Sequence, residues 1–167
     1  KGNFALIIIH IIWAIMLSRK NRQARGEVGY AIAPKKSTWT SRNMGILGTI
    51  ILIFLVIHIR HFYSEAHFGS IPTQVYDGKE VKDLYGEVVR WFKVDWYVAL
   101  YVFCMAALGF HLWHGFTSAF QTLGLNHMKY NGVINLVGKA FAIVVPALFA
   151  WIPIRMWGAD SGCFSQI

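Results

Sequence analysis

The sequence predicts an all-α, polytopic bundle of transmembrane helices. Hydrophobic residues make up 56% of the chain, charged residues make up only 14%, and the mean hydropathy is +0.44. A soluble domain normally carries about 25% charged residues, so this composition favours a membrane protein. The candidate spans are four apolar segments, at about residues 4–17, 43–63, 95–120 and 132–157. We therefore expect a single bundle over residues 1–157, followed by a tail at 158–167.

The first apolar segment is shorter than the other three. A hydrocarbon core about 30 Å thick takes roughly 20 helical residues to cross, and segments two to four reach that length. The first segment offers only about fourteen apolar residues before Ser18, fewer than an ordinary span needs. The sequence also begins at Lys1 without Met. We expect this segment to be a partial span, and we expect a further transmembrane helix before Lys1.

The connections between the segments differ in charge, within a net charge of +8. Residues 18–42 hold seven basic residues and one acidic residue, which predicts a cytoplasmic location by the positive-inside rule. Residues 64–93 balance four basic against five acidic residues and suit the outer side, whereas residues 121–131 return to the cytoplasm. Because the basic residues border apolar spans and form no patch on a soluble fold, nucleic acid is not an expected partner.

The outer loop, residues 64–93, has room for structure of its own. Pro72 and the turn at 76–79 interrupt it, and apolar residues follow at helical spacing from Val81 to Phe92. We expect an amphipathic helix on the outer surface, acting either as a lid over the bundle or in ligand binding. Aromatic residues at its junction with the third segment suggest an interfacial belt: Trp91, Trp96, Tyr97 and Tyr101.

Histidines at membrane depth are the strongest functional signal. An ionisable side chain in hydrocarbon is costly without a partner, and the natural partner of a neutral imidazole is a metal, which suggests haem. His10 and His111 lie eight and ten residues from the cytoplasmic ends of their segments, or roughly 12 and 15 Å at 1.5 Å per residue. His58 lies roughly 22 Å from that side, fifteen residues beyond Asn43. The sequence thus predicts one haem on His10 and His111 and a second position that uses His58.

Other readings of these residues stay open. Each histidine could instead be a hydrogen-bonded core residue or a proton-relay group. His61 and His114 follow His58 and His111 by three residues, so they compete for the same roles. Gly109 and Gly115 flank His111, and small residues there would admit either a porphyrin edge or a neighbouring helix. Gly45 and Gly48 on the second segment suggest ordinary helix packing. Three residues are expected to be structural or solvated: Cys104, His67 and His127.

The third segment carries a family resemblance. Residues 110–124, FHLWHGFTSAFQTLG, resemble the FHLxHGFxSAxQTLG signature of the cytochrome b subunit of bacterial succinate dehydrogenases and fumarate reductases, of the single-anchor, two-haem type. The similarity extends to residues 10–13, 21–26, 39–44 and 55–58. Such anchors have five transmembrane helices, and each of the first four carries one haem ligand. The first segment of this chain matches the second helix of the family.

The resemblance implies a set of ligands and partners. His10 and His111 would bind a proximal haem b, and His58 would bind a distal haem b opposite a histidine of the missing helix. The resemblance also implies an iron–sulfur subunit and a flavoprotein subunit with FAD on the cytoplasmic side, menaquinone as the membrane carrier, and a location in the bacterial inner (cytoplasmic) membrane.

The expected function is electron transfer between iron–sulfur clusters and quinone, within an enzyme complex that interconverts succinate and fumarate. This subunit would do no dicarboxylate chemistry itself. One alternative is the cytochrome b anchor of another respiratory complex, such as a hydrogenase or formate dehydrogenase, and another is a haem-free transporter or scaffold. We also expect Arg19, Lys20 and Arg22 to lie near the propionates of the cytoplasmic-side haem or near the docked iron–sulfur protein, with membrane lipid headgroups as the alternative.

Overall fold

The computed structural model describes residues 2–26, 37–125 and 127–159 in two compact units, Lys1–Gly45 and Ile46–Ile167. The first unit holds α1 (Gly2–Arg25) and the short α2 (Trp39–Arg42), whose first turn is capped by the Thr38 hydroxyl. The second unit holds nearly all of the remaining structure. Of the predicted tail, Gly158 and Ala159 belong to the last helix, and the other residues lie outside the described part of the chain.

The helix α1 is longer than the apolar segment that begins it. It has 24 residues, or about 36 Å at 1.5 Å per residue, because it continues through Ser18 and the basic residues that follow. Arg, Lys and Gln are good helix formers, so the end of the apolar run does not end the helix. By length and composition Gly2–Ala24 can cross a membrane, which corrects the expectation of a partial span. Arg19, Lys20 and Arg22 therefore lie on a helix and not in a loop.

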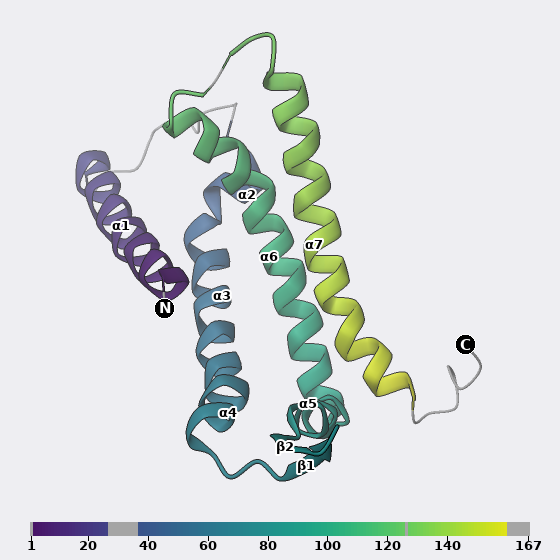
Figure 1. The fold of residues 1–167 in the computed structure, drawn as a ribbon. Coiled ribbons are helices and arrows are strands. Elements are labelled where there is room, and N and C mark those ends of the chain that lie inside the picture. The colour runs from purple at the N-terminus through teal and green to yellow at the C-terminus, as the bar shows by residue number, and fades with distance from the viewer. Residues whose placement is uncertain (1, 27–36, 126, 160–167) are drawn as a thin grey trace. The chain divides into compact units, whose positions relative to one another are not determined.

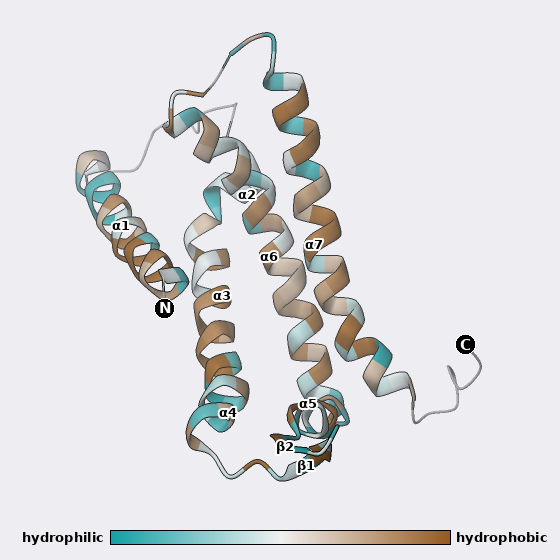
Figure 2. Ribbon diagram, viewed as in Figure 1, coloured by the Kyte–Doolittle hydropathy of each residue, from teal (hydrophilic) through white to brown (hydrophobic). Residues whose placement is uncertain are grey.

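Three further helices can cross a membrane, as predicted. The first of them runs without a break from Met44 to Phe68 through α3 (Met44–His58), the π-helical η1 (Ile59–Ser64) and α4 (Glu65–Phe68). The others are α6 (Asp95–Thr122) and α7 (Asn131–Ala159). Figure 2 shows apolar residues along α3, α6 and α7 and polar residues around α4. The described residues thus form a multi-pass, mostly helical membrane protein.

The outer loop contains a hairpin and a helix. Strands β1 (Thr73–Tyr76) and β2 (Lys79–Lys82) pair antiparallel across Asp77 and Gly78, which both have positive φ, as a type I′ turn requires. The predicted turn is confirmed, whereas the two strands were not predicted. The predicted amphipathic helix is α5 (Leu84–Phe92). It begins three residues later than expected because the Asp83 carboxylate accepts a hydrogen bond from the Gly86 amide at 2.8 Å and caps it.

In the second unit, α6 makes two different contacts (Figure 1). It packs most closely against α7. The Trp157 indole donates a hydrogen bond to Asp95 at 2.8 Å, where α7 ends and α6 begins. On its other side, α6 makes few close backbone contacts with α3. Large side chains bridge that wider space, and a buried cluster containing Phe92 and Val98 closes it at the α5 end.

Candidate functional site

Four polar side chains form one hydrogen-bonded chain between α3, η1 and α6. Nδ1 of His58 lies 3.1 Å from the Tyr101 hydroxyl oxygen, and Nδ1 of His61 lies 2.9 Å from the Tyr97 hydroxyl oxygen. The two tyrosine oxygens lie 3.2 Å apart, which joins the pairs. The π-helical turn starts directly after His58, and such turns occur frequently at functional sites.

The tyrosines of this chain are buried. Tyr97 is 0% exposed and Tyr101 is 5% exposed, so the expectation that they belong to an interfacial aromatic belt is wrong. Their position follows from their hydroxyl groups, which find partners on the neighbouring helix and can therefore leave water. Trp96 is 62% exposed, as expected of a belt residue. Trp91 stacks on His61 with ring centroids 4.0 Å apart and an interplanar angle of 11°.

A cavity of about 670 Å³ adjoins His58. This volume falls within the range of roughly 300–1,000 Å³ typical of cofactor and ligand sites. The walls come from α3 and η1 on one side, α6 and α7 on the other, and α5 at one end, and most of their side chains are apolar. The lining residues are Phe54, Leu55, His58, Phe62, Tyr63, Ala66, His67, Ile71, Leu84, Glu87, Val88, Phe92, Tyr101, Met105, Leu108, Phe149, Ile152 and Pro153.

The residues around this cavity fit a haem group. Nδ1 of His58 is engaged with Tyr101, which leaves Nε2 as the ring nitrogen for a metal. A histidine that binds a metal almost always donates its other ring N–H to a second group, and Tyr101 is placed to accept it. The apolar walls suit a porphyrin ring. His61 is absent from the lining and is directed to Tyr97 and Trp91, so the structure separates the two histidines that the sequence left in competition.

His111 lies at a different level from His58. It follows Tyr101, the partner of His58, by ten residues along α6. Its Cε1 atom lies 3.6 Å from the position that a Cβ atom would take on Gly48, ten residues before His58 on α3. Ten helical residues correspond to about 15 Å. The predicted difference in depth between these two histidines is confirmed, and a Cβ atom on Gly48 would be in ordinary van der Waals contact with the His111 ring.

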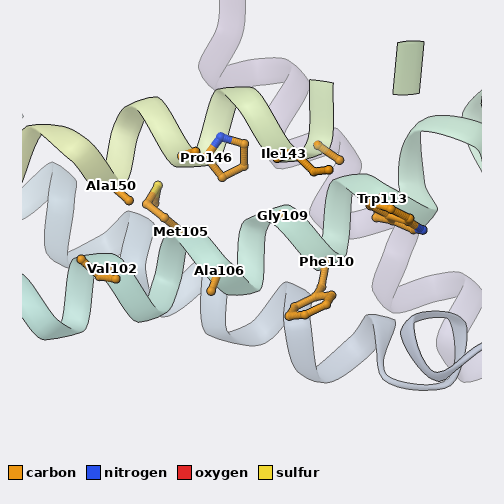
Figure 3. Close-up of a pocket in the computed structure, with 11 residues that line it drawn as sticks. Val102, Met105, Ala106, Gly109, Phe110, Trp113, Ile143, Pro146 and Ala150 are labelled. Atoms are coloured by element: carbon orange, nitrogen blue, oxygen red, sulfur yellow. The ribbon is translucent and has the colours of Figure 1, made fainter. Parts of the chain in front are cut away.

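Gly109 serves helix packing and not ligand approach. A Cβ atom at this position would lie 3.1 Å from the Ala142 carbonyl oxygen of α7. Beside this contact is a smaller cavity of about 380 Å³, shown in Figure 3, between residues of α6 such as Met105 and residues of α7 such as Pro146. All its lining residues are apolar or aromatic, and none is titratable, so it offers no group for metal ligation or acid–base chemistry.

The remaining candidates lie apart from this hydrogen-bonded chain of side chains, and all of them except His67 also lie apart from the cavity. His10 is exposed on α1, in the first compact unit, together with Arg19, Lys20 and Arg22, and a shared haem with His111 stays a prediction. His114 is half-buried on α6. Three expectations are confirmed: Cys104 is buried like a small apolar residue, and His67 and His127 are exposed.

The described residues hold no cluster of metal-binding side chains. Within residues 2–26, 37–125 and 127–159, no three histidine, cysteine, aspartate or glutamate side chains gather as a metal-ion site. A haem with two axial histidines does not need such a group. No family model matches the chain, and no curated protein or solved structure matches it either.

Proposed function

We propose that this chain is the membrane-anchor cytochrome b subunit of a succinate:quinone oxidoreductase or fumarate reductase. It would pass electrons between an iron–sulfur subunit and menaquinone through two b haems. The observation that carries the proposal is His58, held by Tyr101 at the wall of a large apolar cavity between membrane helices. The motif at residues 110–124 supports this particular family of cytochromes.

The residues of the chain would bind, orient and shield the cofactor. Haem, when bound, supplies a carrier of single electrons. His58 would be one axial ligand, and His10 with His111 would hold the second haem. The apolar lining, with rings such as Phe54 and Phe149, excludes water and lowers the local dielectric, and burial of this kind helps to set the reduction potential.

The cytoplasmic side of the proposed complex would hold the iron–sulfur subunit and the FAD-containing flavoprotein subunit. Arg19, Lys20 and Arg22 would lie near the propionates of the haem on His10 and His111, or near the iron–sulfur subunit. A basic residue near an anionic leaflet gains about 1 kcal/mol, so lipid headgroups are the competing partners. Neutralising all three residues should lower haem content or subunit retention. Unchanged haem content and unchanged subunit retention would assign them to lipid.

A haem-free membrane protein is the second candidate, and one observation favours it. The contacts of His58 and His61 with tyrosine hydroxyls would also satisfy two ordinary core histidines. A reduced-minus-oxidised absorption spectrum of the purified native protein separates these possibilities. The proposal expects low-spin haem b, and a spectrum without haem would refute it. Co-purification of flavoprotein and iron–sulfur subunits then distinguishes this complex from a hydrogenase or formate dehydrogenase.

A further inference from the structure

The hydrogen-bonded chain continues beyond the ligand that the proposed function requires. We infer that Tyr101, supported by Tyr97 and His61, is a positioning residue that engages Nδ1 of His58 and holds the tautomer in which Nε2 can bind a metal. The inference rests on the proposed function, because it concerns how His58 presents itself to a haem. It adds a role for three residues that the sequence motifs leave unexplained.

The number of protons in the hydrogen-bonded chain restricts the directions in which its hydrogen bonds can run. Each tyrosine has one hydroxyl proton, and three contacts of 3.1, 3.2 and 2.9 Å link His58, Tyr101, Tyr97 and His61 in that order. A buried donor left without an acceptor costs about 1–3 kcal/mol, so both hydroxyl protons should be used within the chain. Only two arrangements then make all three hydrogen bonds, and they run in opposite directions.

The two directions give His58 opposite tautomers. When the chain runs from His58 to His61, Nδ1 of His58 donates to Tyr101, and Nε2 keeps its lone pair for a metal. When the chain runs the other way, Tyr101 donates to Nδ1 of His58, and the proton on Nε2 prevents ligation. A haem on His58 therefore requires the first direction, in which His61 accepts a hydrogen bond from Tyr97. His61 would thus accept the last of the three hydrogen bonds that support His58 as a ligand.

His61, the last member of the hydrogen-bonded chain, is held in place by α5. The His61 ring stacks on Trp91, and the Trp91 indole donates a hydrogen bond to Glu87 at 2.9 Å. Tyr97 and Tyr101 are one helical turn apart on α6, and the π-helical turn after His58 places His61 opposite Tyr97. Every member of the chain is therefore fixed by a contact on another element.

Replacing the Tyr101 hydroxyl tests the inference. In the full chain within its native complex, Tyr101→Phe should weaken haem retention at His58 by roughly 10- to 100-fold, as loss of such a supporting partner typically does. It should also raise the midpoint potential of that haem, because a ligand that no longer donates its N–H is less basic and stabilises oxidised iron less. Tyr97→Phe should shift the potential in the same direction by a smaller amount. It also serves as the deciding variant should Tyr101→Phe fail to assemble.

The controls separate this inference from the proposed function. The haem on His111 should keep its potential in both variants, and Tyr76→Phe, which removes an exposed hydroxyl on the hairpin, should leave both haems unchanged. A wild-type protein with no haem would overturn the proposed function and the inference with it. The inference alone would be overturned if the wild-type protein has two haems and the Phe variants leave both midpoint potentials and the haem content unchanged. An equal shift of both haems in the Phe variants would overturn it as well.

Discussion

The two sides of α6 show how the same helix serves two purposes. Towards α7, small residues let the backbones approach: Gly109 faces the Ala142 carbonyl group, and Gly138 makes room for the Phe116 ring. Towards α3, ring side chains such as Tyr101 bridge a wider space that encloses a cavity of about 670 Å³. The first contact is a scaffold, and the second has the volume and the polar groups of a site.

The difference follows from how helices associate in membranes. Lipid tails are as apolar as the helices, so association depends on close packing between small residues and on hydrogen bonds across helices. The α6–α7 contact depends mainly on close packing, with hydrogen bonds such as that from Trp157 to Asp95 near its ends. The contact of α6 with α3 and η1 depends on hydrogen bonds through His58 and His61. Protein interiors are close-packed, so a large volume between helices calls for an occupant. Changes on the two sides of α6 should therefore have separable effects.

The largest expected effect on the cofactor side comes from His111→Ala. It should remove one of the two proposed haems, because that iron would lose an axial ligand, while the helices stay inserted. His114→Ala is the matched control, three residues away on the same helix, and it should keep both haems. Haem quantification per polypeptide checks the pair. Loss of haem in the His114 variant with full content in the His111 variant would reverse the assignment.

A substitution on the scaffold side should affect stability alone. A Cβ atom on Gly138 would lie 2.5 Å from Cδ1 of Phe116, so Gly138→Leu forces α6 and α7 apart. Overpacking of this kind costs about 1–3 kcal/mol, which unfolding of the protein in detergent can measure. Gly132→Leu on the same helix has open space within 4 Å and should be close to neutral. Haem content per folded protein should stay the same in both variants, and an equal loss of stability in the two would contradict the account of this contact.

The smallest expected effect is at Gly48. The Cβ atom added by Gly48→Ala would lie 3.6 Å from the His111 ring, an ordinary van der Waals distance, so both haems should remain. Gly48→Phe should displace the His111 ring and lower the content of that haem, while the haem on His58 remains. Separate potentiometric titration of the two haems distinguishes these results. A Phe variant that loses only the His58 haem would show that the levels of the two histidines are misassigned.

Sequence patterns predicted the parts of the fold that depend on composition and local geometry. Long apolar runs predicted the spans, because crossing hydrocarbon takes a set number of helical residues. The turn at Asp77 and Gly78 was predictable because few residues tolerate positive φ. The start of α5 was also predictable, since aspartate is common at the N-cap of helices and Asp83 takes that position. Asp77-Gly78 also signals a two-residue hairpin, but the strands were missed because each has only four residues and little apolar alternation.

The hydrogen-bonded chain could not be predicted with the rules applied to single segments. Tyr97 and Tyr101 were assigned to the membrane interface by their type and place in the sequence, whereas their surroundings depend on which helix α6 faces. One signal was available: tyrosines four residues apart on one segment can match histidines three residues apart on another. The π-helical turn that completes this match has no recognised pattern in the sequence.

In the proposed function, the space between α3 and α6 holds a haem on His58. The most direct test is the reduced-minus-oxidised spectrum of His58→Ala beside that of the wild-type protein, with haem quantified per polypeptide. His67→Ala, an exposed histidine at the same cavity, is the matched control. We expect two haems in the wild type and in the His67 variant, and one haem in His58→Ala. Equal haem content in His58→Ala and the wild type, or no haem in either, would contradict it.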